Sequence, residues 1–178
     1  MKFYDKNIRE MLRYHLVVNG NEPVDEFCIS ENFVRADLVL IGKTGLKGFE
    51  IKSDYDNLFR LPTQAFIYSL YFEENTIVTT EKYIEEVAEI IPSEWGIISM
   101  SRIGELIDIR KPIKNTEISA LTLMQLLTLP ELKNFAKLLK VKNYTKLNKY
   151  EIIYKIWSDS QEEELVYLTC LYLRRRKF

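Results

Sequence analysis

Residues 33–53 read FVRADLVLIGKTGLKGFEIKS, and this stretch decides the fold. Two runs rich in Val, Ile, Leu and Phe flank Gly42-Lys43-Thr44-Gly45, a pattern typical of a β-hairpin closed by a short turn. A turn that is symmetric about Lys43 and Thr44 places Asp37 directly across from Glu50. The sequence therefore predicts two carboxylates side by side on neighbouring strands.

Strand side chains alternate between the two faces of a sheet, so Lys52 is expected on the same face as Glu50. The Cβ atoms of cross-strand partners lie roughly 4.5–5.5 Å apart, and two like charges there destabilise a sheet unless something neutralises them. Half-buried carboxylates with room for water suit Mg²⁺ or Mn²⁺ better than Zn²⁺. Such a metal lowers the pKa of a bound water and shields charge that develops on a phosphate.

Lys52 adds a cation beside this pair in one of two roles: it orients the attacking water, or it stabilises the charge of the transition state. The simpler alternative is that Asp37 and Glu50 are separate, solvated residues and that Lys52 is a surface ion-pair partner. The alternation of apolar Phe49 and Ile51 with the polar residues favours an organised polar face.

Hydrophobic periodicity predicts the elements around this hairpin. They are a helix over Asp5–Val17, strands over Val24–Ile29, Phe33–Ile41 and Leu46–Ser53, a helix from Pro62 to about Phe72, a strand over Thr76–Thr80, a helix over Glu81–Ile91, and a second hairpin of Gly96–Met100 with Glu105–Arg110. The order of helix, three strands, helix and strand indicates an α/β fold.

From Ser119 onward the pattern predicts helices alone. Thr128 begins one of them as part of a capping box, Asn148 caps another, and 160–163 repeats the pattern before the last helix. We therefore expect two domains, residues 1–115 and a small all-helical module over 116–178, with the boundary near 111–116.

Composition excludes several classes of protein. The chain has 178 residues, 47% of them hydrophobic and 29% charged, which is ordinary for a globular protein. Cys28 and Cys170 lie far apart without Cys-x-x-Cys spacing, which fits a reduced chain without a cysteine zinc site. With His15 as its one histidine, the chain is a poor match for Ser-His-Asp triads and multi-histidine zinc sites.

The uncharged stretches are too short to cross a bilayer, and the first ten residues mix charges where a signal peptide is apolar. We therefore expect a cytoplasmic protein without a membrane partner. Residues 1–127 hold 14 Lys and Arg against 20 Asp and Glu, net −6, whereas residues 128–178 hold 11 against 6, net +5, which together give the net charge of −1. The two segments are expected to do different jobs.

Two motifs carry a resemblance to a known family. Asp37 followed by Glu50-Ile51-Lys52 resembles the Asp…Glu-x-Lys signature of the PD-(D/E)XK, or restriction-endonuclease-like, nuclease superfamily. Gln64 and Tyr68 are similar to the Gln-x-x-x-Tyr motif that RecB-type members carry on the helix after the hairpin. Extended from Arg35 to Gln64, the pattern resembles a group of small bacterial and phage members. The resemblance covers about residues 1–100 and implies an αβββαβ core with a mixed central sheet.

The resemblance also implies a metal-dependent nuclease. Its catalytic residues would be Asp37, Glu50, Lys52, Gln64 and Tyr68, with Asp37 and Glu50 holding Mg²⁺ or Mn²⁺. A further acid is expected from the first helix or the first strand, and Glu10 and Glu26 are both candidates. Ala36 stands where the family usually has proline, a harmless departure in the middle of a strand.

Arginines near the motifs offer contacts to a nucleic acid. Arg35 and Arg60 suit phosphate because a guanidinium presents paired N–H donors. The alternative is that they pair with neighbours such as Asp54 or Asp56. Gln64 and Tyr68, one helical turn apart, share one face of their helix, although a tyrosine in so apolar a segment is often simply part of the core.

The basic C-terminal segment resembles SAP-like helix-extended-loop-helix modules, many of which contact DNA. The residues expected to bind nucleic acid there are Lys133, Lys137, Lys140, Lys142, Lys146, Arg174, Arg175 and Arg176. The alternative is a solvated lysine face on a structural helical cap.

These observations lead to one main hypothesis, a Mg²⁺- or Mn²⁺-dependent nuclease that hydrolyses phosphodiester bonds in DNA, with RNA not excluded and a homodimer possible. A second hypothesis is a catalytically inactive nuclease fold that binds nucleic acid or a partner protein. A third is a structural protein whose basic segment docks on an acidic protein surface.

Overall fold

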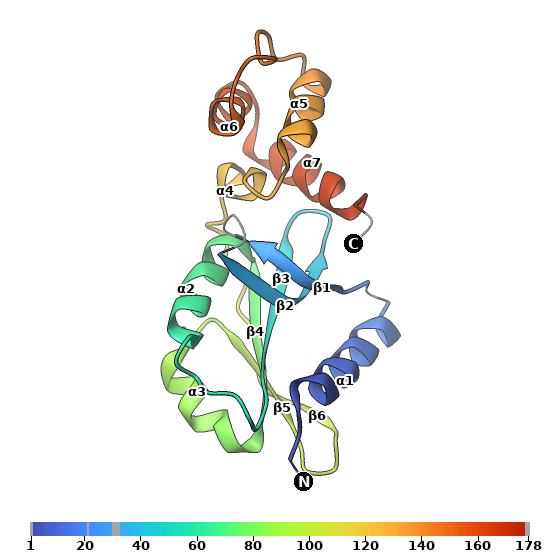
Figure 1. Cartoon of the computed structure of the whole chain (residues 1–178), viewed down its shortest axis with the longest axis vertical. Helices are drawn as coiled ribbons and strands as arrows, with labels where there is room; N and C mark the ends of the chain where they lie inside the picture. Colours follow the sequence, from blue (N-terminus) through green and yellow to red (C-terminus); the bar gives the residue numbers. More distant parts are fainter. Residues whose placement is uncertain (1, 21, 30–32, 177–178) are drawn as a thin grey trace.

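The computed structural model describes residues 2–20, 22–29 and 33–176 and shows a mixed α/β architecture built on one six-stranded sheet (Figure 1). The strands lie in chain order: β1 (Val24–Ile29), β2 (Val34–Ile41), β3 (Leu46–Lys52), β4 (Glu74–Thr80), β5 (Gly96–Met100) and β6 (Leu106–Arg110). β3, β4 and β5 run parallel, and the other neighbouring pairs are antiparallel, so the sheet is mixed.

Helices cover both faces of the sheet, so the central strands are buried on both sides, whereas the edge strands β1 and β6 are largely exposed. On one face lies α1 (Asp5–Val18), whose Ile8 and Leu12 pack with Phe49 and Ile51 of β3. On the other face lie α2 (Leu61–Tyr71), the 3₁₀ turn η2 (Glu81–Tyr83) and α3 (Ile84–Ile90), which share a larger hydrophobic cluster with the sheet (Figure 1).

The hairpin of β2 and β3 has the predicted register. Its pairs are Ile41 with Leu46, Leu40 with Lys47, Val39 with Gly48 and Leu38 with Phe49. Gly48 is needed for close packing, because a Cβ atom there would lie 2.3 Å from the ring of Phe72. The symmetric turn that the sequence predicts is therefore confirmed, and it fixes which residues of the two strands face each other.

The predicted elements of the first 110 residues are present with small shifts at their ends. β4 begins two residues earlier than expected because Glu74 and Asn75 pair with Lys47 and Gly48 of β3. The helix expected over 81–91 begins instead as the 3₁₀ turn η2 and continues as α3. Such shifts at the ends of elements are ordinary, because sheet pairing extends a strand beyond its local sequence signal.

Four helices follow the sheet: α4 (Ala120–Met124), α5 (Leu129–Leu138), α6 (Lys149–Ser158) and α7 (Glu162–Arg174). α5 begins with the predicted capping box at Thr128, and α6 begins with the predicted cap Asn148, which also forms a capping box with Glu151. α7 differs, because its N-cap is Gln161 and makes no side-chain capping hydrogen bond. The boundary at 115/116 stays a prediction, since apolar residues of these helices join the hydrophobic cluster of α2 and the sheet.

Within the described residues no helix combines the length and the apolar composition that crossing a bilayer requires.

Candidate active site

A cleft of about 690 Å³ opens where β2 and β3 approach the start of α2. Its lining includes seven of the residues singled out in the sequence: Glu26, Arg35, Asp37, Glu50, Lys52, Arg60 and Gln64. Asp5, Asp56 and Thr63 line it as well. The structure therefore brings the two predicted carboxylates and the predicted lysine to one cavity, on the side of the sheet that α2 covers.

Asp37 lies at a gap in the sheet. In the described part of the chain, β1 pairs Asp25 with Leu38 and Phe27 with Ala36 but skips the position between, and the β2–β3 register stops at Leu38. The Asp37 carboxylate takes the place of ladder bonds: its Oδ2 accepts a hydrogen bond from the backbone N–H of Ile51 at 2.7 Å. This bond fixes the carboxylate between the strands and beside Glu50.

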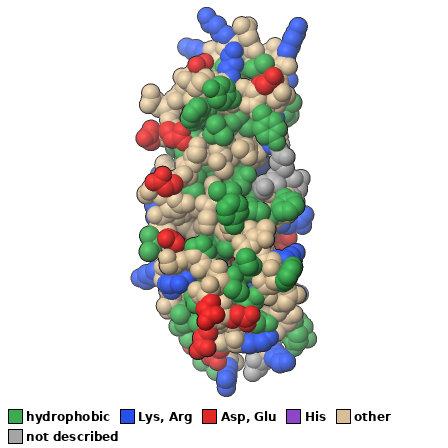
Figure 2. All heavy atoms as spheres, turned by 90° about the vertical axis from the view of Figure 1, so that its left-hand side faces the viewer, with side chains coloured by type: hydrophobic (Ala, Val, Ile, Leu, Met, Phe, Trp, Pro, Cys, Tyr) green, Lys and Arg blue, Asp and Glu red, His purple; other side chains and the backbone are tan. Residues whose placement is uncertain are grey.

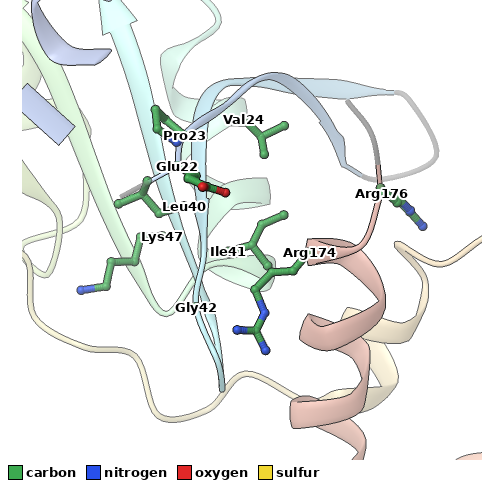
Figure 3. Close-up of a pocket in the computed structure, with 9 residues that line it drawn as sticks. All are labelled: Glu22, Pro23, Val24, Leu40, Ile41, Gly42, Lys47, Arg174 and Arg176. Atoms are coloured by element: carbon green, nitrogen blue, oxygen red, sulfur yellow. The ribbon is translucent and has the colours of Figure 1, made fainter. Parts of the chain in front are cut away.

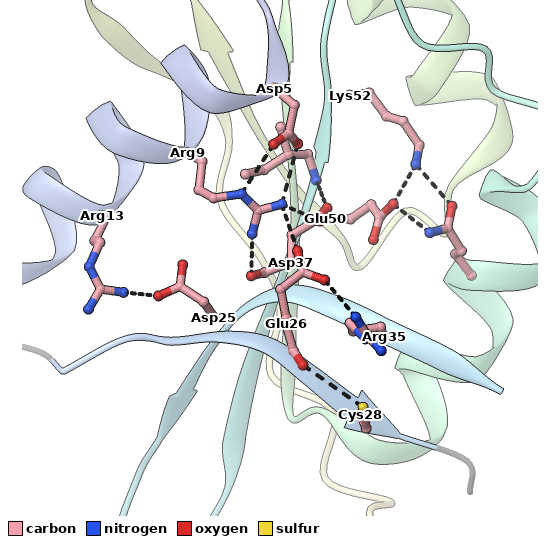
Figure 4. Close-up of polar contacts among 12 residues, drawn as sticks. Asp5, Arg9, Arg13, Asp25, Glu26, Cys28, Arg35, Asp37, Glu50 and Lys52 are labelled. Carbon is pink, nitrogen blue, oxygen red and sulfur yellow. Dashed lines mark hydrogen bonds and ion pairs between the residues drawn. The ribbon is translucent and has the colours of Figure 1, made fainter. Parts of the chain in front are cut away.

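Glu50 and Lys52 form a buried network with α2 (Figure 4). Only 2% of Glu50 and 5% of Lys52 is exposed, and the Lys52 ammonium donates to Oε1 of Glu50. Gln64 bridges the two: its Nε2 donates to Glu50 at 2.6 Å, and its Oε1 accepts from Lys52 at 3.0 Å. Charges so deeply buried are stable only when they are paired and hydrogen-bonded, and the network does this.

Tyr68 completes the environment of Glu50 from the apolar core. It is fully buried, and its hydroxyl donates to Oε2 of Glu50 at 2.5 Å. Burial and the nearby Glu50 charge raise the pKa of Tyr68 well above its usual value, so the hydroxyl stays protonated and keeps donating. Gln64 and Tyr68 lie on one face of α2, as their spacing predicts, and both contact Glu50.

Burial, and after it the negative charge of Glu50, raise the pKa of Asp37 to about 7. The Ile51 N–H and the Arg9 guanidinium act in the opposite direction. Asp37 is therefore poised to change its charge near neutral pH. A strongly shifted carboxyl in a cleft is a common mark of a functional site.

Arg9 of α1 reaches this site from the other face of the sheet, and the sequence analysis did not single it out. Its guanidinium donates to the backbone oxygen and to Oδ1 of Asp37, both at 2.7 Å, and it lies 3.2 Å from Glu26 (Figure 4). It also pairs with Asp5, four residues earlier on α1. The signal that could have revealed it is this Asp-x-x-x-Arg spacing beside the apolar stripe of the helix.

Of the two candidates for a further acid, only Glu26 lines the cleft. Its backbone has a φ of 51°, in the left-handed region that costs a residue other than glycine about 1–3 kcal/mol. This conformation lies opposite Asp37, where the β1–β2 ladder is interrupted. Strain of this kind concentrates at functional sites because the surrounding structure maintains it.

The expectation that Glu10 contributes to the metal site is not met by the geometry. Its side chain is 64% exposed and lies 3.9 Å from Lys6. At about 100° per residue, Glu10 is turned roughly 200° from buried Ile8, so it points away from the sheet. Helix phase alone could have excluded it.

The arginines predicted to bind phosphate lie at the mouth of the cleft. Arg35 is 60% exposed and pairs with Glu26 at 3.5 Å, so the alternative that it pairs with a nearby acid holds for it, with Glu26 in place of Asp54 or Asp56. Arg60 is exposed at the N-cap of α2. Asp56 instead accepts hydrogen bonds from Ser53. Both guanidinium groups are therefore positioned to meet a ligand that enters the cleft.

The donor set fits a hard divalent cation of the Mg²⁺ type. No cluster of three or more acidic, histidine or cysteine residues that could hold a metal is found within residues 2–20, 22–29 and 33–176. Mg²⁺, however, is often held by one or two carboxylates together with water and substrate phosphates. A carboxylate has about four lone-pair sites, so Asp37 and Glu50 can each accept their present hydrogen bonds and still ligate a cation. These two residues would hold the metal.

The basic helical residues lie at the opposite end of β3. Lys52 is six residues from Leu46 along β3, so at about 3.3 Å per residue the candidate site lies roughly 20 Å from the hairpin turn. Arg174 lines a second cleft of about 440 Å³ with residues at that turn (Figure 3). The tail residues exposed to solvent are Lys137, Lys140, Lys142, Lys146, Arg174 and Arg175, whereas Lys133 is half-buried.

Arg176 has a structural role in the fold. Its Nε donates to Glu131 at 2.7 Å, and its guanidinium also donates to the backbone oxygen of Leu126 at 2.8 Å. These contacts tie the end of α7 to the start of α5. Its Nε and Nη2 groups are thus engaged within the protein, and the expectation that Arg176 binds nucleic acid stays a prediction.

Comparison with known proteins identifies the family. The family described as Bacteriophage P4 protein cII matches residues 6–176, which span both the sheet and the helical segment. The chain belongs to this family. One relative, Protein cII of Enterobacteria phage P4, is 39% identical over 75 residues, which make up 42% of this chain. That match spans 28% of the length of the phage P4 protein.

A solved structure resembles this member of the cII family in fold. The SPO1766 protein of unknown function from Silicibacter pomeroyi has a TM-score of 0.52 and 17% sequence identity, and the match covers 81% of this chain and 97% of that one. At this identity the likeness shows a shared mixed α/β fold alone.

Proposed function

We propose that the chain is a metal-dependent nuclease of the PD-(D/E)XK type that hydrolyses phosphodiester bonds in DNA. The observation that carries this proposal is the convergence of Asp37, Glu50 and Lys52 on one cleft, with Gln64 bridging the last two. Two carboxylates and a buried ammonium in one cavity suit the hydrolysis of a phosphate ester better than they suit a purely structural role.

The arrangement of elements supports the finer fold assignment, a restriction-endonuclease-like core. α1, the antiparallel β1–β2–β3 meander, α2 and the parallel β4 follow the αβββαβ order that the resemblance implies. The catalytic hairpin lies at the centre of this core, and α2 supplies the Gln-x-x-x-Tyr pair.

Each protein group has a distinct task in the proposed reaction. A divalent cation bound by Asp37 and Glu50 would supply a polarised water and shield phosphate charge. The Lys52 ammonium has three N–H donors, and Glu50 and Gln64 accept two of them. The third can donate to the attacking water or to a phosphate oxygen. Gln64 holds Lys52 and Glu50 in register, so that neither has to reorganise as charge develops.

Tyr68 and Arg9 position the two acids. The Tyr68 hydroxyl orients Glu50 by donating to its Oε2, and Arg9 orients Asp37 by donating to its Oδ1. Arg35 and Arg60 at the mouth would bind phosphates on either side of the reacting one, because guanidinium groups match phosphate oxygens. The exposed lysines of the α5–α6 region would hold more distant phosphates of the same DNA.

A cleavage assay tests the proposal directly. Purified protein is incubated with single-stranded, duplex and branched DNA in Mg²⁺, in Mn²⁺ and in EDTA, and the Lys52→Ala variant is run beside the wild type. We expect cleavage only when the metal is present, and a cleavage rate about 10²–10³-fold lower in Lys52→Ala. No cleavage of any substrate by the wild type, or full activity of Lys52→Ala, would refute the proposal.

One observation favours a second candidate function, an inactive nuclease fold that binds DNA. Arg9 and Lys52 already neutralise Asp37 and Glu50, so the pair of acids is satisfied by the protein's own cations. A protein of this kind binds DNA equally well in EDTA and as the Asp37→Ala variant, and it breaks no bond. The cleavage assay and a mobility-shift assay in EDTA separate the two functions.

A further inference from the structure

The outward face of α2 is apolar and uncharged. Pro62, Phe66 and Leu70 follow each other at a spacing of four residues, and Phe66 is 67% and Leu70 46% exposed. None of the eleven residues of α2 is charged. A surface helix usually presents polar and charged side chains to water, so this outward face has the character of a surface that is normally covered.

On the same side of the molecule, charged side chains lie above and below the apolar middle. Figure 2 shows hydrophobic side chains across the middle of this side, basic side chains projecting at the upper end and a cluster of acidic side chains towards the lower end. Further acidic side chains lie along the upper left edge, and some basic ones lie beside and below the acidic cluster. α3 lies at that lower end and contributes the exposed Glu85, Glu86 and Glu89. The upper end is the α5–α6 region, with the exposed Lys137 and Lys140.

We propose that this α2 face is the interface of a homodimer, in which a second copy of the chain packs about a two-fold axis through the apolar middle. Such an axis sets Phe66 and Leu70 of one copy against the same stripe of the other. Because the stripe carries no charge, it packs against itself without leaving a charge unpaired.

Charge complementarity favours a second copy over other occupants. A two-fold axis across this side reverses the ends, so that the acidic α3 end of one copy meets the basic α5–α6 end of the other. The net charges of −6 for residues 1–127 and +5 for residues 128–178 agree with this polarity. A nucleic acid does not fit the same face, because α2 offers no cation and the neighbouring α3 repels phosphate.

The interface and the proposed nuclease activity are independent, since the stripe points outward from α2 and the catalytic Gln64 and Tyr68 contact Glu50 inside the cleft. The dimer can therefore be tested without any catalytic readout.

Sedimentation equilibrium over about 1–200 µM protein at low salt tests the proposal. We expect the wild type to dimerise and Phe66→Glu to weaken the dimer at least tenfold, because a buried charge would face its own copy. The matched control is Ile103→Glu, which places the same charge at a residue that is 80% exposed on the turn between β5 and β6. This control is expected to dimerise like the wild type.

A second variant tests the charge argument separately. Lysine at positions 85, 86 and 89 together (Glu85→Lys, Glu86→Lys, Glu89→Lys) is expected to weaken the dimer, and added salt should weaken the wild-type dimer in the same direction. Circular dichroism confirms the fold of each variant, and Leu70→Lys replaces Phe66→Glu if the latter fails to fold. A monomeric wild type throughout, or a dimer that Phe66→Glu or Leu70→Lys leaves unchanged, would overturn the proposal. A monomeric wild-type protein that binds a different protein through this face would also overturn the proposal.

Discussion

The candidate active site and the basic C-terminal helices use charge in opposite ways. In the cleft, Glu50 and Lys52 are almost completely buried, and their charges are bound to each other and to Gln64. In the C-terminal segment, Lys137 of α5 and Lys142 of the loop after it are exposed to water. Burying a charged side chain costs free energy, so a buried charge points to a chemical role. An exposed charge points instead to long-range electrostatic attraction.

Within each region, residues of the same charge also differ in where their side chains lie. In the cleft, Glu26 faces the site, whereas Glu10 of the neighbouring helix does not. In the tail, Arg174 is exposed, whereas Arg176 is committed to Glu131 and to the backbone of Leu126. Charge in the sequence is therefore not enough to assign a role, and each of these pairs offers a matched experiment.

The largest effect is expected in the cleft. Asp37→Asn should lower metal-dependent DNA cleavage by at least about 100-fold, because one of the two carboxylates that would hold the cation loses its charge. Initial cleavage rates at saturating Mn²⁺ measure the loss. Glu10→Gln is the matched control and should cleave like the wild type. Equal loss in both variants would contradict the division between the two acids.

Exposed charge in the tail should govern affinity and its salt dependence. Replacing Lys137, Lys140, Lys142 and Lys146 by alanine is expected to lower the slope of log K against log salt by up to about 3–4, since each phosphate contact contributes about 0.9. Fluorescence anisotropy with a labelled duplex at several salt concentrations measures this slope. A slope unchanged by all four substitutions would assign these lysines to the solvated surface.

A charge of the C-terminal segment that is hydrogen-bonded within the protein should instead affect the free energy of unfolding. Arg176→Ala is expected to cost about 1–3 kcal/mol of unfolding free energy, because Glu131 and the Leu126 carbonyl lose a charged donor. Urea denaturation measures the cost, and Arg175→Ala, at an exposed neighbour, is the control. If Arg176→Ala leaves stability intact and lowers the salt slope of DNA binding, Arg176 belongs with the exposed charges after all.

The smallest expected effect is a shift along the pH axis. Since burial and the charge of Glu50 raise the pKa of Asp37 to about 7, cleavage should increase as pH rises through neutrality. The Arg9 guanidinium lowers the pKa of Asp37, so Arg9→Met should move the midpoint of the cleavage-versus-pH curve to higher pH. Rates measured between pH 5.5 and 9 give the midpoint, and a shift to lower pH would contradict the role given to Arg9.

The same carboxyl has a consequence for stability. Because its native pKa lies above the ordinary value of 3.8, the native state binds the extra proton between about pH 4 and 7. The contribution of Asp37 therefore favours the fold at low pH and is lost as pH rises through about 7. Thermal unfolding of Asp37→Asn should lack this part of the pH dependence, whereas Glu10→Gln should retain it.

Much of the fold could be predicted because the turn sequence of the hairpin fixes the register of its two strands. Two glycines and a symmetric turn place Leu38 opposite Phe49, and alternation then assigns Asp37, Glu50 and Lys52 to one side. The capping box at Thr128 and the cap at Asn148 could also be predicted, because a cap is a local contact between residues three apart.

The parts that could not be predicted depend on contacts across the fold. Arg9 reaches Asp37 through a gap that the left-handed backbone of Glu26 helps to open, and no local pattern announces that conformation. Arg176 meets Glu131 across 45 positions of sequence. Neither contact follows from spacing, because both require knowing how helices and strands pack. Glu10 is different, since its helix phase already pointed it to solvent.

The central claim is that Asp37 and Glu50 together hold a divalent cation. Crystals of the protein soaked in Mn²⁺ and measured near the manganese absorption edge test it most directly. The account predicts an anomalous difference peak between the two carboxylates in the wild type and its loss in Asp37→Asn. Well-soaked wild-type crystals that show no peak in this cleft, or a peak that persists without the Asp37 carboxylate, would contradict it.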